Sequence, residues 1–342
     1  MKFNLAVFLI LCFIVFSLVC TPSAPLVLPV PVLPPPSPPS LIDDDSKKQS
    51  EPSTSPGIEL IILGIAQDAG YPQANCKKDC CSALWNDKSR RKMVSCLGIR
   101  DYKSQKTWLF DATPDFKDQL QILNNDANVP FDLAGIFLTH AHIGHYTGLV
   151  HLGREAMGAE SVEVYTMPKM KSYLASNGPW SQLVSLDNIN LQDLENNKSI
   201  LLAEGRIKVI PLLVPHRDEF SETVGYRIET QNQSVLFIPD IDKWSKWNQD
   251  IKRLISEVDL AFLDGTFYRN GEIWDRDMSQ IPHPFIEESL SLLAPLADDE
   301  KSKVHFIHLN HTNPLLNVKS EEFSDFTTTQ FKVAIEGSTY EL

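Results

Sequence analysis

Thr139-His140-Ala141-His142-Ile143-Gly144-His145 brings three imidazoles within six residues, directly after the apolar run 133–138. That run predicts a buried strand, so the histidines are expected where the strand ends and its loop begins. Side chains two residues apart point the same way in extended backbone, so His140 and His142 can hold one metal ion while His145 reaches a second. Imidazole nitrogen suits zinc and iron. Because the whole chain has only nine histidines, we predict a metal site rather than three unrelated loop histidines.

Later strands are expected to end in the same way. Apolar runs are followed by His216, Asp240, Asp264 and the pair His308 and His311. Side chains at several strand ends meet only if the strands share sheets with one common edge. The pattern therefore predicts an α/β domain with two packed sheets flanked by helices. A carboxylate such as Asp240 can bridge two cations at that edge.

Hydrophobic patterning outlines the elements. Strands are expected at 59–64, 95–101, 107–111, 133–138, 162–166, 206–214, 224–230, 234–238, 258–263, 304–307 and 331–335. Helices are expected at 116–123, 147–157, 169–174, 251–257 and 285–293. The segment 64–70, after the first strand, is expected to be a flexible loop.

The first 57 residues are expected to lie outside the folded domain. Residues 1–20 contain an apolar run and predict a signal peptide or signal anchor. The run is short for a spanning helix, which favours cleavage. Cys20 is a candidate for lipid attachment, although the residues before it match a lipoprotein signal poorly. Residues 21–57 predict a proline-rich, disordered linker. We therefore expect export to the periplasm or cell envelope, either free or anchored at the N-terminus.

Residues 58–342 leave about 285 residues, enough for one large α/β domain. The chain has 31 Lys and Arg against 44 Asp and Glu, a net charge of −13. Recognition of a phosphate backbone needs a basic surface, so this balance argues against nucleic acid and favours a small-molecule substrate. The sequence leaves the oligomeric state open.

Cys76, Cys80 and Cys81 lie within six residues. An exported protein permits disulfides, but so tight a group suits a structural metal, because three thiolates supply three corners of a tetrahedral zinc site. The alternative is a mixture of free thiols and one disulfide. A bridge between the adjacent Cys80 and Cys81 would be strained.

Four further residues are candidates for supporting roles. Asp111 and Asp115 follow a strand, where a carboxylate can orient a metal ligand; turn formation and helix capping are the alternative. Asp264 is a candidate for the same orienting role. His283 precedes a helix and is either a substrate-facing acid or a simple helix-entry residue.

The series of strand-end residues resembles the metallo-β-lactamase superfamily of metal-dependent hydrolases, and the resemblance covers nearly all of the chain from Ile58 onward. The superfamily signature is His-x-His-x-Asp-His, then a lone His, a lone Asp and a final His. The resemblance implies a four-layer αββα sandwich of two mixed sheets flanked by helices. It also implies one metal position at His140, His142 and His216, and another at His145 and His308, bridged by Asp240.

Within that superfamily, several stretches look like the pyrroloquinoline quinone biosynthesis protein B family. They are Tyr71-Pro72-Gln73-Ala74-Asn75-Cys76, Tyr146-Thr147-Gly148-Leu149, Leu263-Asp264-Gly265-Thr266-Phe267 and the segment 306–316. The cyclic-phosphate phosphodiesterase of the carbon–phosphorus lyase pathway is a second relative. It pairs a three-cysteine cluster with a histidine three residues after the last active-site ligand. That analogy implies that His308 belongs to the active site and that His311 completes the Cys76/Cys80/Cys81 zinc site.

Gly144 departs from the superfamily signature, which places Asp there as a ligand of the second metal. Glycine has no donor atom, so the second position keeps His145, Asp240 and His308. Either two metals bind, the second more loosely, or one metal works alone. One bound zinc ion can still lower the pKa of its water to about 7, so both interpretations allow hydrolysis.

These expectations leave three functions. The first is a metal-dependent hydrolase of a small ester, lactone, amide or phosphodiester, in which the metal polarises the scissile group and supplies hydroxide oriented by Asp240. The second is an iron-dependent oxygenase in pyrroloquinoline quinone-like cofactor biosynthesis, because two histidines and a carboxylate suit iron and oxygen chemistry. The third is a non-catalytic binding or carrier protein. Zinc is the expected metal, with one or two ions in the active site and one in the cysteine site, and iron is the alternative.

Overall fold

The computed structural model describes residues 57–126, 129–274 and 276–342. The predicted signal segment 1–20 and the linker up to residue 56 lie outside these described residues, so export and lipid attachment stay predictions. Within the described part of the chain, every helix is too short or too polar to span a bilayer.

Two seven-stranded sheets form the centre of the fold. The order in the first sheet is β14 (Thr339–Glu341), β1 (Ile58–Gly64), β2 (Cys96–Asp101), β3 (Lys106–Phe110), β4 (Asp132–Phe137), β5 (Val162–Thr166) and β6 (Ile189–Asp193). The order in the second is β13 (Lys332–Val333), β12 (Val304–Ile307), β11 (Leu260–Asp264), β10 (Ser234–Ile238), β9 (Val224–Glu229), β8 (Ile207–Leu213) and β7 (Ile200–Leu202). Both sheets mix parallel and antiparallel pairs, as predicted.

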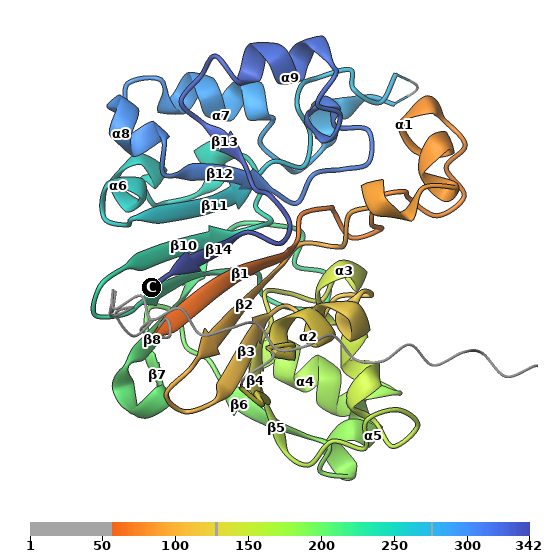
Figure 1. The fold of residues 1–342 in the computed structure, drawn as a ribbon, viewed down its shortest axis with the longest axis vertical. Coiled ribbons are helices and arrows are strands. Elements are labelled where there is room, and N and C mark those ends of the chain that lie inside the picture. The colour runs from red at the N-terminus through yellow and green to blue at the C-terminus, as the bar shows by residue number, and fades with distance from the viewer. Residues whose placement is uncertain (1–56, 127–128, 275) are drawn as a thin grey trace, which may run out of the picture. The chain divides into compact units, whose positions relative to one another are not determined.

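Helices cover the outer faces of the two sheets (Figure 1). The first sheet carries α2 (Phe116–Asn124), α4 (Pro168–Ser176) and α5 (Trp180–Ser185), and the second carries α6 (Ile251–Ser256), α7 (Ile286–Leu293), α8 (Asp298–Lys301) and α9 (Glu321–Phe326). The short helices α1 (Asp79–Ser82) and α3 (Ile143–Tyr146) lie at one edge of the sheets. Short 3-10 helices span Ala83–Trp85, Lys88–Arg90, Thr147–Leu152, Ala203–Gly205, Trp244–Lys246, Met278–Gln280 and Pro314–Leu316. The layers therefore follow the predicted αββα order.

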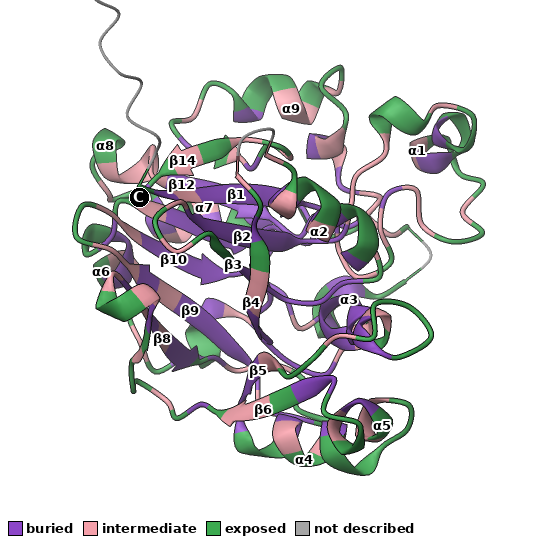
Figure 2. Ribbon diagram, turned by 60° about the horizontal axis from the view of Figure 1, so that its bottom comes forward, coloured by how far each residue is buried: buried purple, intermediate pink, exposed green. Residues whose placement is uncertain are grey.

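The core between the sheets is built on aromatic rings. Phe110 stacks on Phe137 within the first sheet, with ring centroids 5.1 Å apart. Its ring also meets Tyr226 and Phe237 of the second sheet edge-on, at 5.5 and 6.4 Å. All four side chains are fully buried, and the strands that carry them are among the buried segments in Figure 2. Large rings that interlock across the interface fix the two sheets relative to each other.

Strand direction explains why the candidate ligands can meet. In the first sheet β1, β3 and β4 run the same way, because β2 is antiparallel to both β1 and β3, and β3 is parallel to β4. In the second sheet β8, β10, β11 and β12 share one direction for the same reason. Loops that follow strands of one direction lie at one edge of a sheet. Every candidate ligand of the active site follows one of these strands.

Several predicted elements differ from the structure. The helix expected at 147–157 is instead α3 followed by a 3-10 turn that ends at Leu152, and the strand expected at 331–335 pairs only over Lys332–Val333. The strands β6, β7 and β14 and the helices α1, α5, α8 and α9 were not predicted. The three strands lie at or beside sheet edges and expose part of their length, so their sequences lack the continuous apolar pattern of a buried strand.

The Phe110→Ala substitution tests the inter-sheet core. It removes a ring packed on three others, and we expect the free energy of unfolding to fall by about 3–5 kcal/mol. The matched control is Ile335→Ala, whose side chain is 67% exposed. Denaturant titration followed by tryptophan fluorescence measures both variants. A loss below about 1 kcal/mol for Phe110→Ala would contradict this packing.

Candidate metal centre

The loops after β4, β8 and β10 bring His140, His142, His216 and Asp240 together. One ligand atom from each lies within 4.8 Å of all the others. Asp240 Oδ2 is 3.3 Å from His140 Nε2, and Asp240 Oδ1 is 3.2 Å from His216 Nε2. Metal–ligand bonds of about 2.0–2.2 Å place the corners of a tetrahedron roughly 3.3–3.6 Å apart. The spacing therefore suits one tetrahedral ion.

A second group lies directly beside the first and consists of Asp68, His145 and His308. Asp68 Oδ1 is 3.0 Å from His145 Nε2 and 3.3 Å from His308 Nε2. The same two imidazole nitrogens are 3.9 and 4.0 Å from Asp240 Oδ2. Asp240 thus lies between the two groups, in the place expected for a bridging carboxylate.

Asp68 is the site residue that sequence reasoning missed. It lies after β1 in the segment expected to be merely a flexible loop. Its place beyond a strand end is a local signal that could have marked it as a candidate, but not as a partner of His308. The loop pairs with the segment after β12, since Gln67 N donates to Leu309 O over 2.9 Å and Leu309 N donates to Ile65 O over 2.8 Å. This pairing brings Asp68 next to His308.

Buried polar side chains hold the far side of three of the imidazoles. His145 Nδ1 lies 2.7 Å from Asp111 Oδ2, and His140 Nδ1 lies 2.9 Å from Thr139 Oγ1. His308 Nδ1 lies 2.9 Å from the hydroxyl of Thr266. Such partners fix the tautomer and the ring orientation of a metal-binding histidine. Asp111 therefore has the geometry of the predicted orienting role.

The other two candidates for an orienting role, Asp264 and Asp115, lie in different parts of the structure. Asp264 accepts hydrogen bonds from the Thr266 hydroxyl and from Ile241 N, over 2.7 and 3.1 Å. It therefore supports the His308 side of the centre indirectly. Asp115 instead accepts a hydrogen bond from Val94 N, over 2.8 Å. Its carboxylate stabilises the loop between the first two strands.

His283 lies inside the centre. Its Nδ1 is 2.9 Å from Asp264 Oδ2 and 3.2 Å from Asp240 Oδ1, and the residue is only 8% exposed. Burial lowers the pKa of His283, but the charges of Asp264 and Asp240 outweigh burial and raise that pKa to about 9. The position of His283 goes beyond that of a simple helix-entry residue.

The pattern of unpaired buried atoms fits a metal. Among the described residues, the buried atoms His145 Nε2, His216 Nε2 and Asp240 Oδ1 have no hydrogen-bond partner. A buried polar atom without a partner costs roughly 1–3 kcal/mol. These atoms sit where the two groups converge, and a cation bound there would satisfy them. The geometry therefore supports metal binding by both groups.

Two residues of the centre have left-handed backbone. Asp111 has φ of 76° and His308 has φ of 64°. Residues other than glycine pay of order 1–3 kcal/mol for such conformations, which persist where the surrounding structure enforces them. Backbone hydrogen bonds on both sides do so here, from Asp111 N to Phe137 O and from Leu309 N to Ile65 O. The strain turns both side chains toward the centre.

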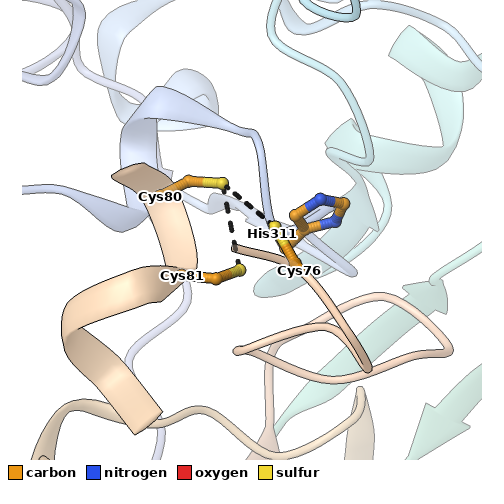
Figure 3. A group of neighbouring side chains, drawn as sticks. All are labelled: Cys76, Cys80, Cys81 and His311. Atoms are coloured by element: carbon orange, nitrogen blue, oxygen red, sulfur yellow. Dashed lines mark hydrogen bonds between the residues drawn. The ribbon is translucent and has the colours of Figure 1, made fainter. Parts of the chain in front are cut away.

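The cysteine group forms a separate cluster, shown in Figure 3. Cys76, Cys80, Cys81 and His311 each offer one ligand atom within 4.8 Å of the others. The Sγ atom of Cys80 is 3.8 Å from the Sγ atoms of both Cys76 and Cys81, and no disulfide joins any of the described cysteines. Zn–S bonds of about 2.3 Å place tetrahedral sulfur atoms about 3.8 Å apart. The spacing fits a tetrahedral zinc site.

A cavity of about 720 Å³ lies between the two clusters. Thr266 and His283 line it on the side of the active centre, whereas Cys76 and His311 line it on the side of the cysteine group. Its volume suits a small molecule. A ligand in the cavity would lie against His283, which in turn contacts Asp240.

Comparisons with known proteins agree with this geometry. Coenzyme PQQ synthesis protein B of Methylorubrum extorquens is 25% identical over 310 residues, which cover 83% of this chain and all of the relative. The crystal structure of Zn²⁺-bound PqqB from Methylobacterium extorquens matches with a TM-score of 0.70 at 22% identity, over 83% of this chain and 100% of that one. A diphosphatase from the PhnP family matches with a TM-score of 0.59 at 21% identity, over 83% of this chain and 97% of that one.

The family model described as the beta-lactamase superfamily domain matches residues 106–308, well over half of the chain. This span contains both histidine groups apart from Asp68. The sandwich of two mixed sheets, the clustered His and Asp residues and the likeness to PqqB all agree with it. The chain therefore belongs to the metallo-β-lactamase superfamily, in which it is a PqqB-like protein.

Proposed function

We propose that this protein is a metal-dependent hydrolase of a small ester, lactone, amide or phosphodiester. The observation that carries the proposal is Asp240, whose buried carboxylate faces both histidine groups. In this proposal His140, His142 and His216 hold one metal ion, and His145 and His308 contribute to a second. Two adjacent cations suit hydrolysis, because one side of the pair stabilises the attacking oxygen and the other the leaving oxygen.

Zinc bound in this centre would act as a Lewis acid and bring the pKa of water to about 7. The protein's own groups would supply orientation. Asp240 would accept a hydrogen bond from a water molecule held between the groups. His283 lines the cavity and contacts Asp240, so it is placed to exchange a proton with a bound substrate. Asp264 fixes His283 and thereby acts as a positioning residue.

The similar structures support hydrolysis in general terms. The superfamily includes hydrolases, and the diphosphatase of the PhnP family and human tRNase Z, short form, share the fold, the latter with a TM-score of 0.51. The acidic balance of this chain favours a small substrate over a tRNA.

An iron-dependent oxygenase is the second candidate. Asp68, His145 and His308 make up two histidines and one carboxylate, the ligand set that non-haem iron uses with oxygen. The likeness to Coenzyme PQQ synthesis protein B supports this candidate, with a role in quinone-cofactor synthesis. The adjacent His140/His142/His216 group favours hydrolysis, because oxygen chemistry at a single iron does not require it.

Metal content and activity of the His216→Ala variant test the proposal. We expect purified protein to hold zinc and to cleave bis(p-nitrophenyl) phosphate or a p-nitrophenyl ester. His216→Ala removes one ligand, so its hydrolysis rate should fall by at least about 100-fold. Removing a side chain that only hydrogen-bonds to a ligand typically costs 10–100-fold. Metal analysis by mass spectrometry and initial rates measure both effects.

The matched control is His151→Ala, because His151 stacks on Phe116 at 5.9 Å and lies outside both groups. Its rate should stay within about twofold of the wild type. Iron with oxygen consumption would instead support the oxygenase. Metal confined to the cysteine group, without turnover, would support a non-catalytic binding protein and overturn the proposal.

We also propose that Cys76, Cys80, Cys81 and His311 hold a structural zinc ion. The group joins two segments far apart in sequence, since the cysteines follow β1 and His311 follows β12. A metal bound there would tie these loops together and stabilise the fold.

Substitution of Cys81 by Ser tests the structural site. The variant should lose about one zinc equivalent per chain and melt several degrees lower, because about 1 kcal/mol corresponds to roughly 2–4 °C in a domain of this size. Cys96→Ser is the control for zinc content, since this thiol is buried elsewhere and contacts Leu97 O and Asp111 O. Equal zinc content in the Cys81 variant and the wild type would refute the assignment.

A further inference from the structure

We propose that Asp68 supplies, from the loop after β1, the metal-binding carboxylate that the superfamily signature places at position 144. The inference rests on the metal centre of the proposed function, but its test is metal affinity rather than turnover. Gly144 appears in the sequence as a lost ligand. The structure shows a carboxylate in the same space, reached from a different part of the chain.

The first argument is steric. A Cβ atom built on Gly144 would lie 2.4 Å from Asp68 Oδ1 and 2.5 Å from Asp68 Cα. Real Cβ atoms essentially never approach another heavy atom that closely. A side chain at position 144 and Asp68 in its observed place therefore exclude each other. Gly144 is the residue that lets the Asp68 loop approach.

The second argument is the direction in which the Asp68 carboxylate points. Oδ1 points at the two imidazoles of the second group, 3.0 Å from His145 Nε2 and 3.3 Å from His308 Nε2, and its side chain is 14% exposed. Both histidines have their other ring nitrogens held, His145 by Asp111 and His308 by Thr266. The Nε2 atoms of His145 and His308 and the Oδ1 atom of Asp68 therefore face one point. With Asp240 this position has four protein ligands instead of three.

The third argument is rigidity. The Asp68 loop is fixed on both sides, because Ala66 N donates to Met93 O over 2.9 Å and Gly70 N donates to Gln67 O over 2.7 Å. Ala66 also forms a parallel bridge with Leu309. Ligands on rigid elements are positioned more precisely than ligands on loops, and these bonds tie the Asp68 loop to neighbouring strands. The relocated carboxylate therefore makes a tight second position, rather than the loose one expected from Gly144 alone.

Zinc titration of two variants tests the inference. Asp68→Asn keeps the shape but removes the charge, and it should weaken the second active-site zinc at least about tenfold. Gly144→Ala changes no ligand, yet its Cβ would displace Asp68 and should weaken the same zinc. Competition with a chromophoric chelator measures the affinities, and cobalt substitution with visible spectra reports the coordination.

The controls are Asp118→Asn, an exposed carboxylate on α2, and Gly178→Ala, where an added Cβ meets nothing within 4 Å. Both should bind zinc like the wild type, and melting curves verify that each variant is folded. Unchanged second-site affinity in folded Asp68→Asn would overturn the inference even if the enzyme hydrolyses its substrate. Conversely, a confirmed Asp68 ligand with no hydrolysis would refute only the proposed function.

A second, independent observation concerns the charge of the cavity. Four cationic residues line it, namely Lys77, Lys78, Arg217 and Arg276, and no Asp or Glu is among the described lining residues. The chain as a whole carries a net charge of −13. Within the described part of the chain, Lys77, Lys78 and Arg276 form no ion pair, and Arg217 has only a loose one, 3.6 Å from Glu219. The side chains that line the cavity therefore carry a positive charge, whereas the protein as a whole is negative.

We infer that the substrate is an anion whose carboxylate or phosphate group binds these cations while its scissile bond lies at the metal centre. Guanidinium groups bind both anions through paired hydrogen bonds, and clefts lined by one charge concentrate ligands of the opposite charge. Phe267, Ile273 and Ile281 add an apolar wall, which suits a hydrocarbon segment between the two ends. This inference rests on the proposed function and names its substrate class.

Binding of small probes tests the inference separately from hydrolysis. Calorimetry of the zinc-loaded protein with glutarate and with glycerol 3-phosphate should show binding, and the stronger probe identifies the anion. Neutral glutaramide should bind at least about tenfold more weakly, the size expected for losing a charged hydrogen bond. Arg276→Gln should weaken the anion to a similar extent.

Arg253→Gln is the control, because Arg253 is an exposed residue on α6 and outside the cavity. It should bind the probes like the wild type. Equal binding of glutarate and glutaramide, no binding of either anion, or unchanged affinity in Arg276→Gln would each overturn the inference. Anion binding without hydrolysis would leave the cavity assignment standing and refute the hydrolase.

Discussion

The attraction between one buried carboxylate and the imidazoles around it organises this structure. Asp240 is 2% exposed, and His140, His216 and His283 each approach it to within 3.3 Å. Burying so many polar groups is costly unless each is paired or bound to a cation. The strands that share one direction in each sheet place these groups at one edge. The interlocked aromatic rings fix the two sheets relative to each other. The fold therefore serves to hold charged groups at separations that a metal ion can stabilise.

Much of this arrangement could be predicted from local patterns. Apolar runs that end in His or Asp identified His140, His216, Asp240 and His308, because a strand of a buried sheet needs continuous hydrophobic residues and its ligand must follow the last of them. The same rule gave the two sheets and the flanking helices. It failed for short edge strands such as β6, because part of each strand is exposed and its sequence is not continuously apolar.

Asp68 shows why the rest could not be predicted. Its place depends on the pairing of Ala66 with Leu309, two residues more than 240 positions apart, and no local pattern encodes such a contact. Gly144 therefore looked like the loss of a ligand. The structure gives it the opposite meaning, because the absence of a side chain makes room for a carboxylate from another loop. His283 was a candidate from the sequence, but its contacts with Asp240, which follows β10, and with Asp264, at the end of β11, depend on the same long-range packing.

The cysteine group and the Asp68/His145/His308 group also depend on the same two loops. The loop after β1 carries Asp68 and then Cys76, and the loop after β12 carries His308 and then His311. A zinc ion in the cysteine group would therefore hold together the two loops that supply ligands to the second active-site position. The cationic cavity lies between the clusters. The cysteine group, the Asp68/His145/His308 group and the cavity thus form one continuous region at the sheet edge.

Anomalous diffraction at the zinc edge, from crystals of the zinc-loaded protein, tests the central claim most directly. The account predicts one peak among His140, His142, His216 and Asp240, and a second with a carboxylate oxygen of Asp68 about 2.0–2.2 Å away. A single active-site peak, or a second ion with the Asp68 carboxylate turned away from it, would contradict the account.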